Sequence, residues 1–348
     1  MMHYFRASVV LFVTIFAVIH YYLNLSNENQ DVLELTSCVL YVVGTSFIVW
    51  KYMAFLKTGG NILKLEEILA SPILCEYSVT KENIFEETVN SKFFPICKGI
   101  GIAFTIVANT LEIKCGFERK LFLPLKVFGS LENNVICFYY VIFQVSFSML
   151  ITWNYVLIDV LCCKMMSIAT ATLTVLKNNL ENIPYENQNF DFLVVTFKKN
   201  IILHKEILRF TSLIEESFSF VILTIILSGA LINCICGIII LKINLTLAEG
   251  FTFFLFFACV MNQIAIYCWF GEQIMSKSVE ISTSSYMTKW YAADVKFRKL
   301  LFIFMERVKK PIILRAGNFF PLNVRTLATI LHKSYSAFTV LQQFYKDK

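Results

Sequence analysis

Apolar runs separated by short polar connections dominate the chain. Seven runs approach or reach the length of about twenty residues with which a helix crosses a bilayer. They cover residues 7–23, 35–56, 94–111, 135–161, 218–241, 251–271 and 320–344. The first run resembles the core of a secretion signal, but no small-residue cleavage site follows it cleanly, so we expect a retained span. The pattern predicts an all-α integral membrane protein with seven transmembrane helices.

Two stretches between the spans keep the apolar spacing of helices. They are residues 161–217, interrupted near Pro184, and residues 272–318. Both are too charged for lipid and too apolar for water, so we expect spans four, five and six to run on into the cytoplasm as an anchor bundle. The predicted units are spans one to four over 1–160, anchor helices over 161–217, spans five and six over 218–271, further anchor helices over 272–318 and a last span over 319–348.

The last apolar run carries a polar stripe along one helical face. At about 100° per residue, the stripe comprises Arg325, Thr329, His332, Ser336, Thr339 and Gln343. A helix surrounded by lipid would not tolerate it, because each buried polar group costs several kcal/mol. We expect the stripe to line an aqueous pore; the alternative is a helix on the membrane surface or in a bundle core.

Composition supports a membrane protein and charge gives its orientation. Of the residues, 57% are hydrophobic and 16% charged, against about 45–50% and about 25% in soluble domains. Lys and Arg gather in alternate connections, above all after the sixth run, which predicts a cytoplasmic N-terminus and an extracellular C-terminus. The two N-x-S/T sequons, at Asn24 and Asn244, fall on the predicted outside and are glycosylation candidates.

Sequence patterns of catalysis and metal binding are missing. The chain has four His and no HExxH, Walker A or GxSxG motif. It has no CxxC pair, and most of its eleven Cys lie in apolar runs, where a thiol behaves as a small hydrophobe. We therefore expect no enzyme, no metal site and no cofactor.

Several residue runs, in order, resemble those of insect odorant receptors. They are HKEILRF at 204–210, YCWFGE at 267–272, WY at 290–291, AGNFFPL at 316–322 and SYSAFTVL at 334–341. The resemblance implies a non-selective cation channel opened by a small volatile ligand. Four subunits would surround a pore lined by the last helix, usually in a mixture with a co-receptor, in the plasma membrane of olfactory sensory neurons.

Two features refine the resemblance. The connection between spans four and five lacks the long insertion of the co-receptor, so the chain resembles a ligand-tuned subunit. Related gustatory receptors end in a Thr-Tyr, five apolar residues, Gln-Phe motif; here Gln343-Phe344 is kept, but Ser336-Ala337 stands where Thr-Tyr would be.

The resemblance also implies where the sites lie. Ligand contacts are expected in the outer halves of spans two, three, four and six, at Tyr41, Phe47, Phe104, Ala108, Tyr140, Gln144, Phe147, Phe254, Phe257 and Met261. The pore is expected at Ser336, Thr339 and Gln343, with Val340 as its narrow outer gate. Trp269, Glu272 and Trp290 are expected to anchor the cytoplasmic bundle. For each ligand candidate, bundle packing or lipid contact is the competing interpretation.

Three other functions stay open from the sequence. One is a metabotropic seven-helix chemoreceptor without its own pore, which an intracellular C-terminus would indicate. Another is a gustatory-type receptor channel. The third is a structural subunit that completes a channel but binds no ligand.

Overall fold

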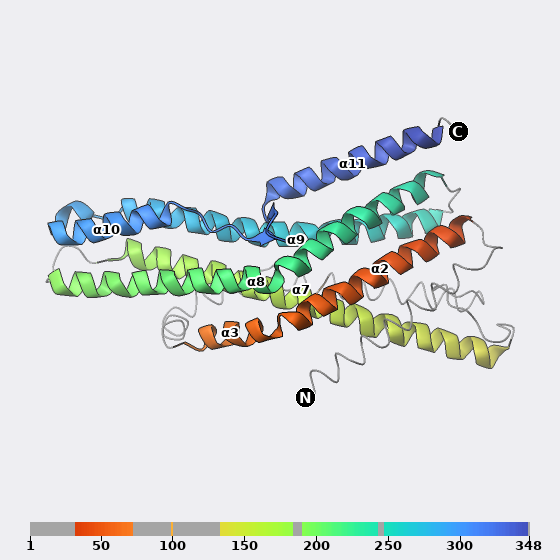
Figure 1. Cartoon of the computed structure of the whole chain (residues 1–348), viewed down its shortest axis with the longest axis horizontal. Coiled ribbons are helices and arrows are strands. Elements are labelled where there is room, and N and C mark those ends of the chain that lie inside the picture. The colour runs from red at the N-terminus through yellow and green to blue at the C-terminus, as the bar shows by residue number, and fades with distance from the viewer. Residues whose placement is uncertain (1–31, 72–98, 100–132, 184–189, 243–246, 347–348) are drawn as a thin grey trace.

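Long helices laid side by side form almost all of the chain that the structure describes (Figure 1). The computed structural model describes residues 32–71, 99, 133–183, 190–242 and 247–346. The helices are α2 (Val32–Lys57), α3 (Gly59–Leu69), α7 (Asn134–Glu181), α8 (Phe190–Lys242), α9 (Leu247–Tyr286), α10 (Val295–Val308) and α11 (Val324–Lys346), with a 3-10 turn at Trp290–Ala292. Except for residue 99, the spans predicted at 7–23 and 94–111 lie outside the described residues.

Helices α7, α8 and α9 are much longer than a bilayer requires. They contain 48, 53 and 40 residues, which at 1.5 Å per residue is about 60–80 Å, against a hydrocarbon core of roughly 30 Å. The predicted continuation of spans four, five and six into longer helices is therefore confirmed. Helix α7 ends just before Pro184, whose ring and missing N–H disfavour helix in the residues before it.

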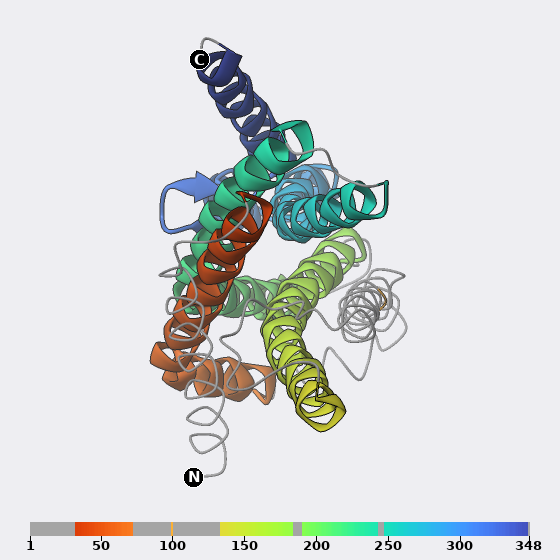
Figure 2. The same cartoon turned by 90° about the vertical axis from the view of Figure 1, so that its right-hand side faces the viewer.

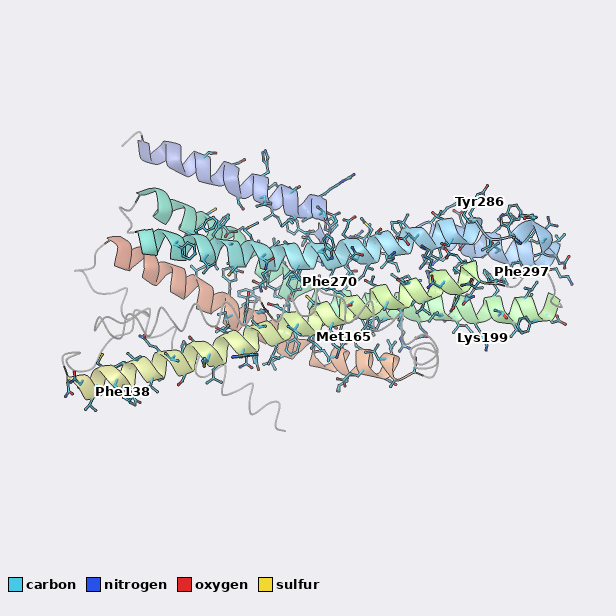
Figure 3. The ribbon with its side chains drawn as sticks, turned by 180° about the vertical axis from the view of Figure 1, so that it is seen from behind. Phe138, Met165, Lys199, Phe270, Tyr286 and Phe297 are labelled. Atoms are coloured by element: carbon cyan, nitrogen blue, oxygen red, sulfur yellow. The ribbon has the colours of Figure 1, made fainter. Side chains whose placement is uncertain are left out.

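Much of the buried core lies in the extensions of these helices, far from the N-terminal end of α7. There Phe197 of α8 packs against Phe297 and Phe304 of α10, with ring centroids 5.2 and 5.4 Å apart. At the other end α7 diverges from the remaining described helices, and Phe138 is 68% exposed (Figure 3). The apolar stretch of α7 is thus exposed along much of its length, whereas the extension of this helix, over residues 162–180, is mostly buried.

Helix α3 is not expected from the sequence, which predicts a connection there. It follows α2 after one residue and carries charged side chains on much of its surface. Leu65 and Ile68 are nevertheless buried in the main hydrophobic core, and α3 lies against α8. Burial of these two residues against the rest of the fold stabilises a helix that the local sequence alone does not predict.

A short hairpin links α10 to α11. Strand β1 (Arg315–Ala316) pairs antiparallel with β2 (Phe320–Pro321). Gly317 and Asn318 turn the chain with φ values of 59° and 63°, in the left-handed region that these two residue types tolerate best.

The hairpin corrects the predicted start of the last span. That span was expected over 320–344, but the helix begins at Val324 because β2 takes residues 320–321. Asn323 caps the helix by accepting from the Thr326 N–H at 2.8 Å. From the hairpin, α11 runs along one side of the bundle next to α8 and α9, away from α3 (Figures 1 and 2).

The hairpin approaches α9 so closely at Gly271 that only glycine fits. A Cβ at that position would overlap the carbonyl oxygen and the Cβ of Leu322. We expect Gly271→Ala to lower the stability of the folded chain by about 1–3 kcal/mol, because the overlapped atoms belong to backbone or lie beside it. The measurement is the thermal midpoint of the purified protein in detergent.

Gly44→Ala is the matched control for that substitution. Gly44 lies within α2, and a Cβ there would meet nothing within 4 Å. Alanine favours a helix interior over glycine, so Gly44→Ala should leave the thermal midpoint unchanged or raise it slightly. Equal midpoints for the two variants would show that the contact between Gly271 and Leu322 does not hold the hairpin.

Candidate functional site

Polar side chains contact one another where α2, α7 and α9 meet. At their centre, the Asp159 carboxylate of α7 lies 2.6 Å from the Lys51 Nζ of α2. Gln263 and Tyr267 of α9 donate to the same carboxylate at 2.6 and 2.5 Å. Lys51 also donates to the Tyr155 carbonyl at 3.0 Å, and its Nζ lies 3.3 Å from the centre of the Tyr155 ring. We call Lys51, Tyr155, Asp159, Gln263 and Tyr267 the polar cluster.

The polar cluster ties three helices together, and two of its five residues are fully buried. Lys51 and Tyr267 are each 1% exposed, and the Tyr155 hydroxyl closes the cluster by donating to Gln263 at 3.2 Å. The polar cluster was not expected from the sequence, although a signal was present: Lys51 and Asp159 are ionisable residues inside apolar runs. Such residues are rare in spans and commonly mark functional positions.

The predicted ligand residues that fall in described helices come from the three helices that form the polar cluster. Helices α2, α7 and α9 run through the bundle in the same direction (Figure 1). The candidates precede the cluster residue on each helix: Phe47 before Lys51, Phe147 before Asp159 and Met261 before Gln263. They therefore lie on one side of the polar cluster, toward the N-terminal ends of these helices.

Burial differs among these candidates. Gln144 and Phe147 are buried, and Phe143 stacks on Phe147 with ring centroids 6.0 Å apart. Tyr140, Phe47, Phe257 and Met261 are half-buried, and Phe254 is 59% exposed. Tyr41 lies within α2, whereas Phe104 and Ala108 lie outside the described residues. Their roles as ligand contacts stay predictions.

The described part of the polar stripe on α11 faces away from the core of the subunit. Arg325, Thr329 and His332 are exposed, while Leu327 and Ile330 of the same helix pack against the hydrophobic core. Further along, Ser336 and Thr339 are half-buried, and each hydroxyl donates to a carbonyl of its own helix, at 2.9 and 2.8 Å. Val340 and Gln343 follow in the same helix.

Glu272 of α9 contacts the start of α11. Its carboxylate accepts from the Val324 N–H at 3.3 Å, which places a negative charge at the positive end of the helix dipole. Trp290, the second predicted anchor, donates from its indole N–H to the Tyr286 carbonyl at 3.2 Å and packs edge-on to Phe302. Trp269, the third, is 47% exposed. The anchoring roles of all three stay predictions.

Two titratable groups in the helix extensions are shifted by their surroundings. Burial, and then the charge of Arg307, lower the pKa of His204 to about 4, so this histidine packs as a neutral ring edge-on to Phe304. Burial would raise the pKa of Glu280, but hydrogen bonds from Lys177 and Lys277, both at 2.9 Å, hold it below the usual value. The Glu280 carboxylate thus joins α7 to α9 as an ion.

Asn24 and Asn244, the glycosylation candidates, lie outside the described residues. Within the described part of the chain, the stretches Asn134–Glu181 and Asp191–Gly237 are long and apolar enough to cross a membrane, judged by length and composition. No group of three or more His, Cys, Asp or Glu that could hold a metal ion occurs among the described residues.

Comparison with known proteins gives consistent matches. A family model described as 7tm Odorant receptor matches residues 29–335. Among curated proteins, the chain is 23% identical over 192 residues to putative odorant receptor 92a and 28% identical over 182 residues to odorant receptor 22b, both from Drosophila melanogaster. These matches cover 55% and 51% of this chain and 47% and 45% of the relatives. The chain thus spans about half the length of the curated relatives that it matches.

The fold is similar to that of a solved receptor. The insect olfactory receptor OR5 from Machilis hrabei superposes with a TM-score of 0.78 at 13% sequence identity, covering 97% of this chain and 88% of that one. Its structure in complex with eugenol superposes with a TM-score of 0.74 at 15% identity. At such identities the likeness concerns the fold, and it confirms the predicted helical membrane architecture.

Proposed function

The chain belongs to the 7tm odorant receptor family, and from this premise we propose that it is a ligand-tuned subunit of an odorant-gated, non-selective cation channel. The family consists of receptors, not enzymes. The observation that carries the channel proposal is the polar stripe of α11, whose residues Arg325, Thr329 and His332 are exposed on the side away from the subunit's core. A surface of that kind in a membrane protein needs water or another subunit beside it.

The ligand, in this proposal, is a small volatile organic molecule held among α2, α7 and α9. Support comes from the related receptor solved with eugenol and from the aromatic and apolar candidates on one side of the polar cluster. An apolar site with few polar groups suits such a ligand. Binding would open the pore only to the extent that the ligand prefers the open state.

The gate is assigned to Val340 on α11, with Ser336, Thr339 and Gln343 lining the pore beside it. A ring of apolar side chains closes a pore by excluding water, and a ring of amides passes partly hydrated cations with little selectivity. The N-terminus would lie in the cytoplasm and the C-terminus outside, as the Lys and Arg distribution favours. The helix extensions would then form the cytoplasmic anchor.

The partner in this proposal is a co-receptor, with which the chain forms a mixed tetramer in the plasma membrane of olfactory sensory neurons. The test is whole-cell current during an odorant panel, in cells expressing this chain alone or with a co-receptor, with G-protein signalling blocked. Fast cation currents with both chains support the tuned subunit. Currents that vanish under the block would replace the channel with a metabotropic receptor.

A further inference from the structure

Helix α8 carries one buried polar side chain that is only half satisfied. Asn233 is 5% exposed, and its Nδ2 donates to the Met261 Sδ of α9 at 2.8 Å. Its Oδ1 is buried as well, yet it has no hydrogen-bond partner within the part of the chain that the structure describes. The Asn233 Nδ2 thus has a hydrogen-bond partner among the described residues, whereas the Oδ1 has none.

Two other buried polar residues near Asn233 in α8 are satisfied by their own helix. Thr224 donates to the Phe220 carbonyl at 2.9 Å, and Ser228 donates to the Ile225 carbonyl at 3.1 Å. Asn233 differs because its free atom is an acceptor, and the N–H groups of a helix interior are already used. An unpaired buried acceptor destabilises the fold and calls for an explanation.

The residues next to Asn233 along α8 pack among apolar side chains of three helices. Ile232 and Cys236, which lie one turn apart on α8, are buried against Val43 of α2 and Val260 of α9. Met261, next to Val260, is one of the residues expected to contact the ligand. The unpaired oxygen therefore lies beside the proposed ligand site, on a helix from which no ligand contact was expected.

We propose that the Asn233 Oδ1 is the hydrogen-bond acceptor for a hydroxyl-bearing ligand, an alcohol or a phenol, bound beside Met261. This assignment rests on the proposed ligand function of the bundle. The oxygen needs a donor, which ethers, esters and hydrocarbons lack. An ammonium group would bring a charge into an apolar cluster, at a large desolvation cost. A neutral hydroxyl satisfies the oxygen without that cost.

The experiment measures binding directly, as the thermal stabilisation of the purified full chain by matched probe pairs. The pairs are octanol with octyl methyl ether and phenol with anisole; in each pair a methyl group replaces the hydroxyl proton. For wild type we expect tighter binding of the hydroxyl member. Asn233→Leu should weaken that member about tenfold and leave the ether unchanged, as loss of one hydrogen bond predicts. Without ligand, Asn233→Leu should melt at or above wild type, because the unpaired acceptor is gone.

Asn154→Leu is the matched control. Asn154 lies on α7 and donates to the Leu150 carbonyl of its own helix at 2.7 Å, so this variant should keep the preference for hydroxyl probes. If Asn233→Leu kept the preference for hydroxyl probes, the ligand would not bind the Asn233 Oδ1. A water molecule would then be the partner of that oxygen, and the proposal would be overturned. Equal weakening of alcohol and ether, or a wild type that binds no probe, would overturn it too. Intact binding without odorant-gated current would instead count against the channel function alone.

Discussion

Replacing Asp159 by asparagine should abolish the odorant response and much of the folded protein. The Asp159 carboxylate accepts from Lys51, Gln263 and Tyr267 across three helices. Asparagine is close in size but leaves the Lys51 ammonium buried without a counter-charge, and breaking a buried pair in this way costs about 3–5 kcal/mol. Surface delivery of the tagged receptor and its thermal midpoint should both fall sharply.

Two variants sharpen this test. Glu181→Gln removes a carboxylate near Lys177, 4.0 Å away at a much more exposed position, and should cost less than about 1 kcal/mol. The double variant Lys51→Met with Asp159→Leu removes both charges, and apolar replacement of a buried pair is often tolerated. We expect it to regain much of the thermal midpoint. An Asp159→Asn protein as stable as wild type would show that the polar cluster does not hold the helices together.

Replacing Val340 by serine should give a channel that leaks without odorant. In the proposed assembly Val340 forms the apolar ring that excludes water, and a hydroxyl at each position would let water and cations through. We expect unliganded current to rise several-fold in cells that also express the co-receptor. The readout is basal current, with the added response to odorant correspondingly smaller.

Leu331→Ser is the control for the gate because it introduces the same side chain on the same helix. At about 100° per residue, position 331 falls on the face opposite Val340, and Leu331 is 44% exposed. Basal current should stay at the wild-type level in this variant. Equal leak in both variants would assign the effect to loss of stability in α11, and unchanged leak in Val340→Ser would place the gate elsewhere.

The sequence predicted the long helices well because their physical signals are local. Apolar runs of spanning length, followed by amphipathic spacing up to Pro184, contain enough information to predict α7. The same holds for α8 and α9, whose extensions keep their apolar face through charged stretches such as 272–286. Hydrophobic periodicity depends on neighbours within a few residues, so it is readable without a fold.

The start of α11 and the existence of α3 depended on contacts between distant segments. The β1–β2 hairpin forms because Gly317 and Asn318 turn the chain against α8 and because Gly271 leaves room for Leu322. Gly317-Asn318 and Pro321 were visible as turn signals. The contacts of these residues with α8 and α9 were not visible in the sequence.

The candidate site likewise combines residues that were recognisable from the sequence with contacts that were not. Lys51 and Asp159 were recognisable as charges within spans, but their pairing joins helices more than a hundred residues apart along the chain. Asn233 gave no sequence signal, since an asparagine in an apolar run is usually satisfied by its neighbours. Only the packing of α8 against α9 shows which of its two amide atoms has a partner.

In the proposed channel, the polar face of α11 lines the conduction pathway. The most direct test is state-dependent modification of Ser336→Cys by a charged, membrane-impermeant thiol reagent, applied from outside during whole-cell recording with the co-receptor. We expect the reagent to block odorant-evoked current in this variant, and only when odorant has opened the Val340 gate. We expect no block in wild type or in Leu331→Cys. Block at Leu331→Cys with none at Ser336→Cys would place the polar face of α11 outside the pore.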